Sequence, residues 1–145
     1  MNESDYLAEL TMDGQALLLP QTEVRLLESV LDLHSDPARG EVWLQSEGQH
    51  IPVWSLDREL RPLPNLPTGR RFCALLGPEQ QPFGLTLGGF RLVPRSGCRL
   101  LPLPPALRGT DSPLLGLVIL DDRILPVSDA ARLARRLPWP AEATP

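Results

Sequence analysis

The sequence contains no lysine and few residues that bind metals or act as nucleophiles. All 14 of its basic residues are arginine, and it has two cysteines and two histidines. The cysteines, Cys73 and Cys98, lack the close CxxC spacing of a metal or redox pair. We therefore expect no metal site, and we expect both cysteines to be buried thiols in a reducing compartment rather than a disulfide.

Long apolar runs and basic clusters are also missing. No stretch approaches the roughly 18 apolar residues of a transmembrane helix. The polar, acidic start, residues 1–9, does not resemble a secretory signal. We therefore expect a cytoplasmic protein without direct membrane insertion. The formal net charge is -4, and the densest basic spots, Arg70-Arg71 and Arg135-Arg136, are interpreted as solvated pairs. Nucleic-acid binding is therefore not expected.

Groupings typical of catalysis are absent as well. His34 and His50 stand apart from any cysteine or serine at a recognised nucleophile spacing. The glycine-rich stretch Gly84–Gly89 lacks the lysine and the following helix of a phosphate-binding loop. The acidic pair Asp121-Asp122 and the nearby Asp111 could bind a cation, but acids in turns are usually only solvated. We therefore expect neither an enzyme nor a bound cofactor.

What the sequence does contain is proline, 17 residues spread along the chain, which excludes long helices almost everywhere. The apolar runs are short and are bounded by turn-forming residues, a pattern typical of a barrel or sandwich of many strands. Asp13-Gly14, Glu47-Gly48 and Asp121-Asp122 each separate two such runs and predict tight hairpins. The predicted strands are Ala8–Met12, Ala16–Leu19, Glu41–Gln45, His50–Ser55, Arg71–Leu76, Phe83–Leu87, Arg91–Val93, Leu115–Leu120 and Ile124–Val127.

Two segments carry helical signals. Gln21–Ser29 is equally compatible with a short helix and with a bent strand. Ser128–Leu137 is predicted as a helix, because Ser128 or Asp129 can cap it and its apolar residues fall on one face. Beyond it, residues 138–145 are expected to form a loose tail, in which Trp139 either packs on the body or stays exposed.

An internal repeat organises the chain. Glu41–Val53 aligns with Leu115–Val127 at an offset of 74 (127 minus 53), and both place a proline near the end of the second strand. Leu17–Leu27 matches Phe83–Val93 more loosely, at an offset of 66 (83 minus 17). We expect a tail over residues 1–9 and two barrel subdomains, 10–66 and 67–137, that share an apolar interface, since each half is small for an independent core.

The order of these features resembles the CheW family of chemosensory coupling proteins. That family begins with a glycine-turn hairpin and a valine-rich segment, which correspond here to Met12–Pro20 and Glu23–Leu27. Its Asn-Leu-Arg-Gly motif, followed by Pro-Val or Pro-Ile and an Asp-Leu pair, corresponds to Gln45–Leu56. A Gly-Leu-x-Val-Asp-x-Val pattern corresponds to Gly84–Phe90. The closing strands and helix correspond to Leu115–Leu133.

The chain departs from the family pattern at several positions. The family arginine falls on Glu47, which is a charge reversal, and the family asparagine falls on Gln45. The Asp-Leu pair falls on Ser55-Leu56, and a Val-Asp pair of the second half falls on Leu87-Gly88. The sequence therefore resembles a diverged member of the family.

The resemblance implies an all-β fold of two five-stranded barrels, similar to Src-homology-3 barrels, with a short C-terminal helix. It also implies a non-catalytic adaptor that links the cytoplasmic tip of a chemoreceptor to a CheA-type histidine kinase. The equivalent protein-binding positions are Val24, Gln45, Glu47 and Gly48. The alternative readings are core packing for Val24, a strand-end polar residue for Gln45, a solvated turn residue for Glu47 and a turn glycine for Gly48.

The charge reversal at Glu47 favours a second hypothesis. In it, the chain is a CheW-like interaction module of another pathway, such as type IV pilus or surface-motility signalling. Its partner would then be a protein other than the standard kinase.

Overall fold

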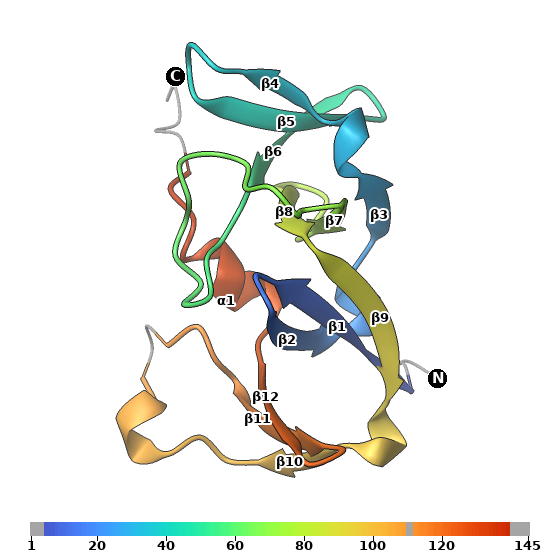
Figure 1. Cartoon of the computed structure of the whole chain (residues 1–145), viewed down its shortest axis with the longest axis vertical. Coiled ribbons are helices and arrows are strands. Elements are labelled where there is room, and N and C mark those ends of the chain that lie inside the picture. Colours follow the sequence, from blue (N-terminus) through green and yellow to red (C-terminus); the bar gives the residue numbers. More distant parts are fainter. Residues whose placement is uncertain (1–4, 110–111, 140–145) are drawn as a thin grey trace.

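The computed structural model describes residues 5–109 and 112–139 and is built almost entirely of short strands (Figure 1). Sheet A has the order β10-β11-β12-β2-β1-β9, and sheet B has the order β3-β7-β8-β6-β5-β4. The fold is therefore all-β, as predicted, with six strands in each sheet where five were expected. The strands are β1 (Tyr6–Met12), β2 (Gln15–Pro20), β3 (Leu26–Ser29), β4 (His34–Asp36), β5 (Glu41–Ser46), β6 (Gln49–Trp54), β7 (Phe72–Leu76), β8 (Phe83–Leu87), β9 (Gly89–Pro94), β10 (Arg99–Leu101), β11 (Gly116–Leu120) and β12 (Arg123–Val127).

The three predicted hairpin turns join β1 to β2, β5 to β6 and β11 to β12. Both central residues of each turn have positive φ: 52° and 81° at Asp13-Gly14, 50° and 79° at Glu47-Gly48, and 50° and 64° at Asp121-Asp122. This is the requirement of a type I′ turn, whose twist matches that of the flanking strands. The local turn chemistry therefore identified these hairpins correctly.

The two sheets contain the same strand order, built twice. Counting from the edge, β3-β7-β8-β6-β5-β4 corresponds strand by strand to β9-β1-β2-β12-β11-β10. Both sequence offsets, 74 and 66, are found at equivalent strand pairs. Strand β6 pairs in parallel with β8 at Val53 and Gly84, and β12 pairs in parallel with β2 at Val127 and Leu18. Val53 corresponds to Val127 at the first offset, and Leu18 corresponds to Gly84 at the second. The first repeat runs from β1 to β6 and the second from β7 to β12. The hairpin β1–β2 of the first repeat lies in the sheet of the second, and the hairpin β7–β8 of the second lies in the sheet of the first.

This exchange changes how the chain divides. Sheet B consists of β3 to β8 and so spans the expected boundary at residues 66 and 67, whereas sheet A combines β1 and β2 with β9 to β12. The expected N-terminal tail also differs, since β1 already begins at Tyr6. Hairpin signals are local, but which hairpin joins which sheet depends on long-range pairing that the repeat does not reveal.

Three apolar clusters hold the strands together. One lies inside sheet A and includes Leu18, Val118 and Leu125, and a smaller one inside sheet B includes Leu44 and Ile51. The largest lies between the sheets and is shared by β1, β2, β7, β8 and the C-terminal helix. Its buried members are Ala8, Leu10, Met12, Leu17, Leu19, Leu56, Leu60, Ala74, Leu76, Phe83, Leu85, Leu87, Ala130, Leu133 and Leu137. The central strands bury both faces, as continuous apolar runs such as Ala16–Leu19 imply.

Arg70 forms polar contacts with both sheets. Its side chain is only 1% exposed, and its guanidinium pairs at 2.9 Å with Asp13 in the β1–β2 turn of sheet A. It also donates hydrogen bonds to the backbone oxygens of Leu56, at 2.8 Å, and Thr86, at 3.1 Å. The interpretation of Arg70-Arg71 as a solvated pair is therefore wrong for Arg70, although Arg71 is exposed. Adjacent arginines indicate charge but carry no information on burial.

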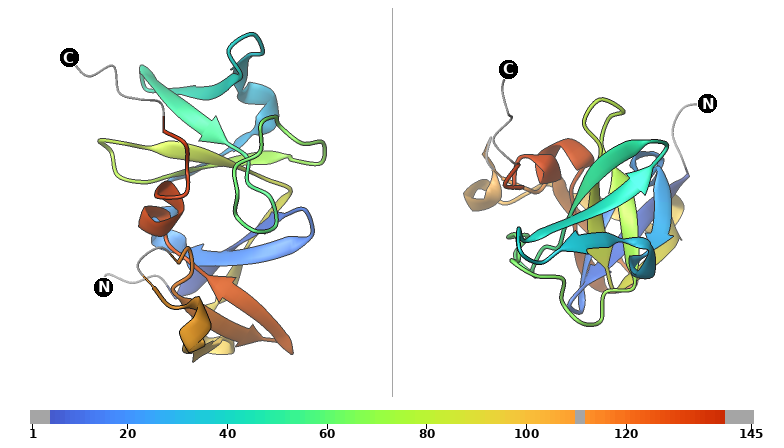
Figure 2. Two further views of the ribbon diagram at one scale, coloured as in Figure 1. Left: turned by 90° about the vertical axis from the view of Figure 1, so that its left-hand side faces the viewer. Right: turned by 90° about the horizontal axis from the view of Figure 1, so that it is seen from above.

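The C-terminal segment covers the junction of the sheets (Figure 2). Helix α1 is Ala130–Ala134, shorter than predicted, with Asp129 as its N-cap. Trp139 packs edge-on against Trp54 and Phe83 at centroid distances of 4.8 and 5.9 Å. The expected loose tail is thus anchored at its start, while residues 140–145 lie outside the described part of the chain.

Both structures predicted for Gln21–Ser29, a short helix and a strand, are present in part. It forms a 3₁₀ turn at Gln21–Glu23 and then strand β3.

Candidate protein-interaction surfaces

Three of the four predicted binding residues meet at the tip of the β5–β6 hairpin. Gln45 lies near the end of β5, opposite His50, and Glu47 and Gly48 form the turn itself. All three are exposed. The turn type explains the positive φ at Glu47 and Gly48, so their backbone conformation does not by itself indicate a binding role.

Val24, the fourth predicted residue, has different surroundings. It follows the 3₁₀ turn Gln21–Glu23, in the segment that leads from sheet A to sheet B, and its N–H donates to the Gln21 oxygen at 3.0 Å. Its side chain is half-buried and packs against the cluster shared by the two sheets. Val24 therefore takes part in core packing and keeps some exposed surface.

An apolar surface on sheet A, which the sequence reasoning missed, covers the outer side of β10, β11 and β12. In β11 and β12 one set of residues is buried and the alternate set points outward, whereas β10 has no buried residue and its Leu100 is 72% exposed. Ile124 in this outward set is 63% exposed. We call this surface the β10–β12 face; its members are Leu101, Leu117, Ile119, Ile124 and Pro126. A continuous apolar strand such as Gly116–Leu120 signals it, because it makes both faces of the strand apolar.

A second apolar surface lies at the edge of sheet B. We call it the β3 edge; it comprises Leu26 and Leu27 of β3 and Leu31 of the next 3₁₀ turn, Val30–Asp32. Leu31 is 89% exposed, and the backbone around it is fixed by its N–H, which donates to Ser29 Oγ at 3.1 Å. Because successive residues of a strand point to opposite faces, Leu26 and Leu27 lie on the two sides of this edge strand, and Leu31 is its most exposed apolar neighbour.

A shallow groove lies where sheet A meets the loop that follows β6. Its volume is about 190 Å³, and its wall includes Met12, Leu17, Leu60, Leu114 and Pro126. Asp57, Arg58 and Glu59 add charged groups to the same wall. The groove therefore offers an apolar floor with a charged rim, the usual composition of a protein contact.

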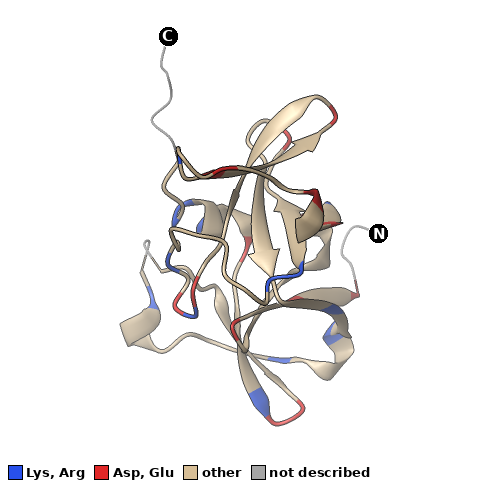
Figure 3. Cartoon of the chain, turned by 45° about the horizontal axis from the view of Figure 1, so that its top comes forward, with Lys and Arg blue, Asp and Glu red and all other residues tan. Residues whose placement is uncertain are grey.

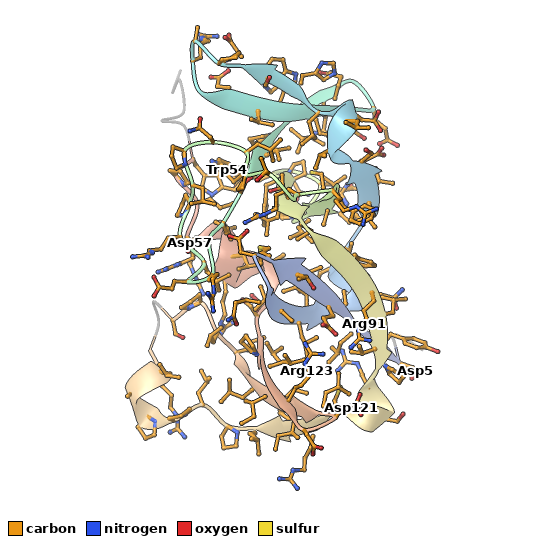
Figure 4. The ribbon with its side chains drawn as sticks, in the orientation of Figure 1. Asp5, Trp54, Asp57, Arg91, Asp121 and Arg123 are labelled. Atoms are coloured by element: carbon orange, nitrogen blue, oxygen red, sulfur yellow. The ribbon has the colours of Figure 1, made fainter. Side chains whose placement is uncertain are left out.

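Charges of both signs are interspersed over the two sheets (Figure 3). On sheet A the buried carboxylate of Glu9 pairs with Arg91 at 2.8 Å and with Arg123 at 3.2 Å, and thus ties β1 to β9 and β12. Figure 4 shows Arg91 and Arg123 side by side there. These arginines take part in an internal network and do not form a free basic patch.

The cysteines are poorly placed for nucleophilic chemistry. Cys73 is buried, and burial raises the pKa of its thiol to about 12, so the reactive thiolate is scarce at neutral pH. Cys98 is only half-buried, so the expectation of a buried thiol is wrong for it; partial burial still raises its pKa, and its Sγ donates to the Pro94 oxygen.

Residues 5–109 and 112–139 contain neither a metal-binding cluster nor a membrane-spanning helix. No group of three or more His, Cys, Asp or Glu side chains is placed there to hold a metal ion. None of the helices in this part is long and apolar enough to cross a membrane.

Comparisons with known proteins give a structural match and no sequence match. No family model and no curated protein sequence matches the chain. Among solved structures it is similar to the scaffolding protein TtCheW from Thermoanaerobacter tengcongensis, with a TM-score of 0.62 and 13% sequence identity. The match covers 92% of this chain and 89% of that one. The chain therefore has a CheW-like fold, which confirms the predicted resemblance at the level of fold.

Proposed function

We propose that this protein is a non-catalytic, cytoplasmic adaptor that holds two protein partners at once. The observation that carries the proposal is the CheW-like fold, which extends over 92% of the chain and matches a scaffolding protein. The two apolar surfaces support it, because the β10–β12 face belongs to sheet A and the β3 edge to sheet B. The large cluster shared by the sheets holds these surfaces in a fixed relation.

The partners we propose are a CheA-type histidine kinase and the cytoplasmic tip of a chemoreceptor in a bacterial chemosensory array. The hairpin tip, with Gln45, Glu47 and Gly48, and the linker residue Val24 are the proposed contact positions, together with the two apolar surfaces. Large exposed apolar side chains would supply most of the binding energy, and the charged rim would govern association rate.

Surface variants of the full chain test this function. Purified cognate kinase and receptor tip are each titrated against the wild type, Ile124→Arg and Leu31→Arg, and binding is measured by calorimetry. Each variant is expected to weaken one partner at least 10-fold, the loss of a central apolar contact, and to leave the other partner unchanged. Because each variant should still bind one partner normally, its loss of binding to the other cannot be due to misfolding. If the wild type binds neither kinase nor receptor, the coupling function is wrong.

Glu47 favours one alternative function, an interaction module of pilus or surface-motility signalling with a partner other than the standard kinase. Its carboxylate is exposed on the hairpin tip, where the resemblance places an arginine. If that arginine normally faces an acidic partner, Glu47→Arg should increase the association rate with a standard CheA-type kinase and make it more dependent on salt. An unchanged or slower association would refute the idea of a charge reversal.

A further inference from the structure

A second concavity, larger than the groove on sheet A, adjoins the β5–β6 hairpin. It is a cleft of about 660 Å³ between β5 and β6, the proline-rich loop that follows β6, the β7–β8 turn and the C-terminal Pro138-Trp139. Figure 4 shows Trp54 beside that loop. A volume of this size lies within the range of ligand-binding clefts and would hold several residues of an extended peptide.

Proline and tryptophan make up 7 of the 19 described residues that line the cleft. Trp54 and Trp139 lie edge to face, with their centroids 4.8 Å apart and their planes at 71°. Five prolines line the same space, namely Pro52, Pro62, Pro64, Pro82 and Pro138. Proline rings cannot change their backbone φ, so these walls are largely preformed before a ligand arrives.

One indole N–H in the cleft is available to a ligand. Trp139 Nε1 donates to the Ala134 oxygen at 2.8 Å and is therefore occupied. Trp54 Nε1, by contrast, has no hydrogen-bond acceptor among the described residues. It is not one of the fully buried atoms without a partner, so it is accessible from outside. The side-chain amides of Gln49, Asn65 and Gln80 also line the space. The cleft thus combines apolar ring surfaces with donors for carbonyl oxygens.

His50 is held rigidly at one side of the cleft. Its ring stacks on Trp43 at 4.7 Å and 15°, and Trp43 in turn stacks on His34 at 5.7 Å and 17°. These three rings lie on the outer face of β4, β5 and β6. The stack fixes the orientation of the imidazole and extends the apolar surface beyond the cleft.

The charge of the cleft is negative. Glu41 is the one Asp, Glu or Arg side chain among the described lining residues, and it is exposed. Asp36 lies directly opposite it on β4. A ligand with a basic group near Glu41 would therefore be favoured over an acidic one.

We propose that this cleft binds an extended proline-rich peptide with a basic residue, supplied by a partner protein. The polyproline II helix has no internal hydrogen bonds, so its carbonyls are free for the Trp54 N–H and the glutamine amides. Its proline rings stack on aromatic walls, as in other aromatic-lined grooves that select this conformation. The site is separate from the β10–β12 face and the β3 edge, but it adjoins the hairpin tip through Gln49 and His50, so kinase and receptor binding are measured alongside peptide binding.

The test uses the full-length protein and three synthetic nine-residue peptides. The first has prolines at three-residue spacing and one arginine, the second has alanine at every proline, and the third has glutamate in place of the arginine. Binding is followed in ¹⁵N-labelled protein by the indole N–H resonance of Trp54. We expect the first peptide to shift this resonance saturably, and the alanine peptide to bind at least 10-fold more weakly because it loses its preformed conformation.

Charge variants assign the basic residue of the peptide. Glu41→Lys should weaken binding of the arginine peptide about 5-fold and strengthen binding of the glutamate peptide, as expected for one exposed ion pair. Asp32→Lys makes the same charge change at an exposed residue outside the cleft lining and should alter neither affinity by more than about 2-fold. Both exposed substitutions leave the core intact, and thermal denaturation checks this.

Three results would overturn the proposal. They are no saturable shift of Trp54 at up to about 1 mM peptide, equal binding of the proline and alanine peptides, and equal effects of the two charge variants. Kinase and receptor binding are measured in parallel with Glu41→Lys. If kinase and receptor binding are unchanged and the peptide test fails, peptide binding in the cleft is rejected and the proposed adaptor function is not affected.

Discussion

Removal of the Arg70 guanidinium, in the variant Arg70→Met, tests whether one buried side chain joins the two sheets. Methionine keeps much of the apolar stem but cannot donate hydrogen bonds. The change takes donors from the Leu56 oxygen, the Thr86 oxygen and the Asp13 carboxylate. Thr86 Oγ1, which also accepts from Arg70, keeps its 2.6 Å hydrogen bond with Ser55.

The expected loss in the free energy of unfolding follows from the hydrogen bonds that each acceptor loses. Asp13 is 36% exposed and regains water, so its loss is small. The two backbone oxygens are deeper, and a buried acceptor left without a donor costs about 1–3 kcal/mol. Relief of the buried charge, whose Nε has no partner, offsets part of this cost. The expected destabilisation is therefore about 2–3 kcal/mol, a large share of the usual 5–15 kcal/mol of a domain.

The assay is urea denaturation at neutral pH, with Arg71→Met as the matched control. Arg71 is the next residue, is exposed, and places its guanidinium 5.7 Å from the Phe72 ring, a contact worth about 0.5–1 kcal/mol. We expect the midpoint of Arg70→Met to fall well below that of Arg71→Met. Equal midpoints for the two variants would refute the idea that Arg70 links the sheets.

Two further predictions concern single buried contacts. A methyl group on Gly84 would lie 2.7 Å from Cys73 Sγ and 2.9 Å from Val53 Cγ2, so Gly84→Ala should cost about 1–3 kcal/mol in urea denaturation. Gly89→Ala, with its nearest atom at 3.5 Å, should cost less, and the reverse order would be inconsistent with the packing. Burial raises the pKa of Glu23 above 4.5, although the Ala130 N–H donates to its carboxylate at 2.6 Å. The folded state therefore binds the Glu23 proton more tightly, and the stability due to Glu23 is present below pH 4.5 and lost as the pH rises through the raised pKa. Thermal denaturation of the wild type against Glu23→Gln should show this decline with pH, and a parallel pH dependence in the two proteins would contradict it.

The sequence allowed local structure to be predicted well because turns and alternation are local properties. Asp13-Gly14 and Glu47-Gly48 gave hairpins with the expected turn geometry. Strands β4 and β10 were missed, since His34–Asp36 and Arg99–Leu101 are three residues long and lack a bounded apolar run. Sheet membership was also missed, because the β12–β2 contact joins residues more than one hundred positions apart.

The candidate surfaces were predictable only where a motif marked them. The hairpin at Gln45 and Glu47 came from a family motif and lies at an exposed turn. The aromatic cleft came from no motif, because Glu41, Pro82 and Trp139 meet only through the fold. The β10–β12 face was hidden in strands that read simply as apolar, and only the pairing decides which of their side chains point outward.

The arrangement of the cores predicts that the two sheets unfold together. Residues 26–87 contain every strand of sheet B, so this segment looks like a separate domain. Its own inner cluster has only 5 buried residues, however, whereas the cluster between the sheets has 15. An isolated fragment of residues 24–88 would expose seven of those shared side chains, including Phe83 and Leu85. Exposing each of the six larger ones, all except Ala74, costs about 1.5–3 kcal/mol, so the total of roughly 9–18 kcal/mol is as large as the whole stability of an ordinary domain, about 5–15 kcal/mol.

We therefore expect the fragment of residues 24–88 to give no cooperative urea transition, and the full chain to give one. Trp43 and Trp54 lie in sheet B, and the third tryptophan, Trp139, packs on Trp54 and Phe83, so fluorescence reports on sheet B and the C-terminal segment against it, whereas far-ultraviolet circular dichroism reports on both sheets. The two signals should have coincident midpoints in the full chain. A folded fragment, or two separate transitions, would show that the sheets are independent and that the shared cluster contributes little. In that case the two apolar surfaces would not be held in a fixed relation, and the adaptor would act as a flexible tether.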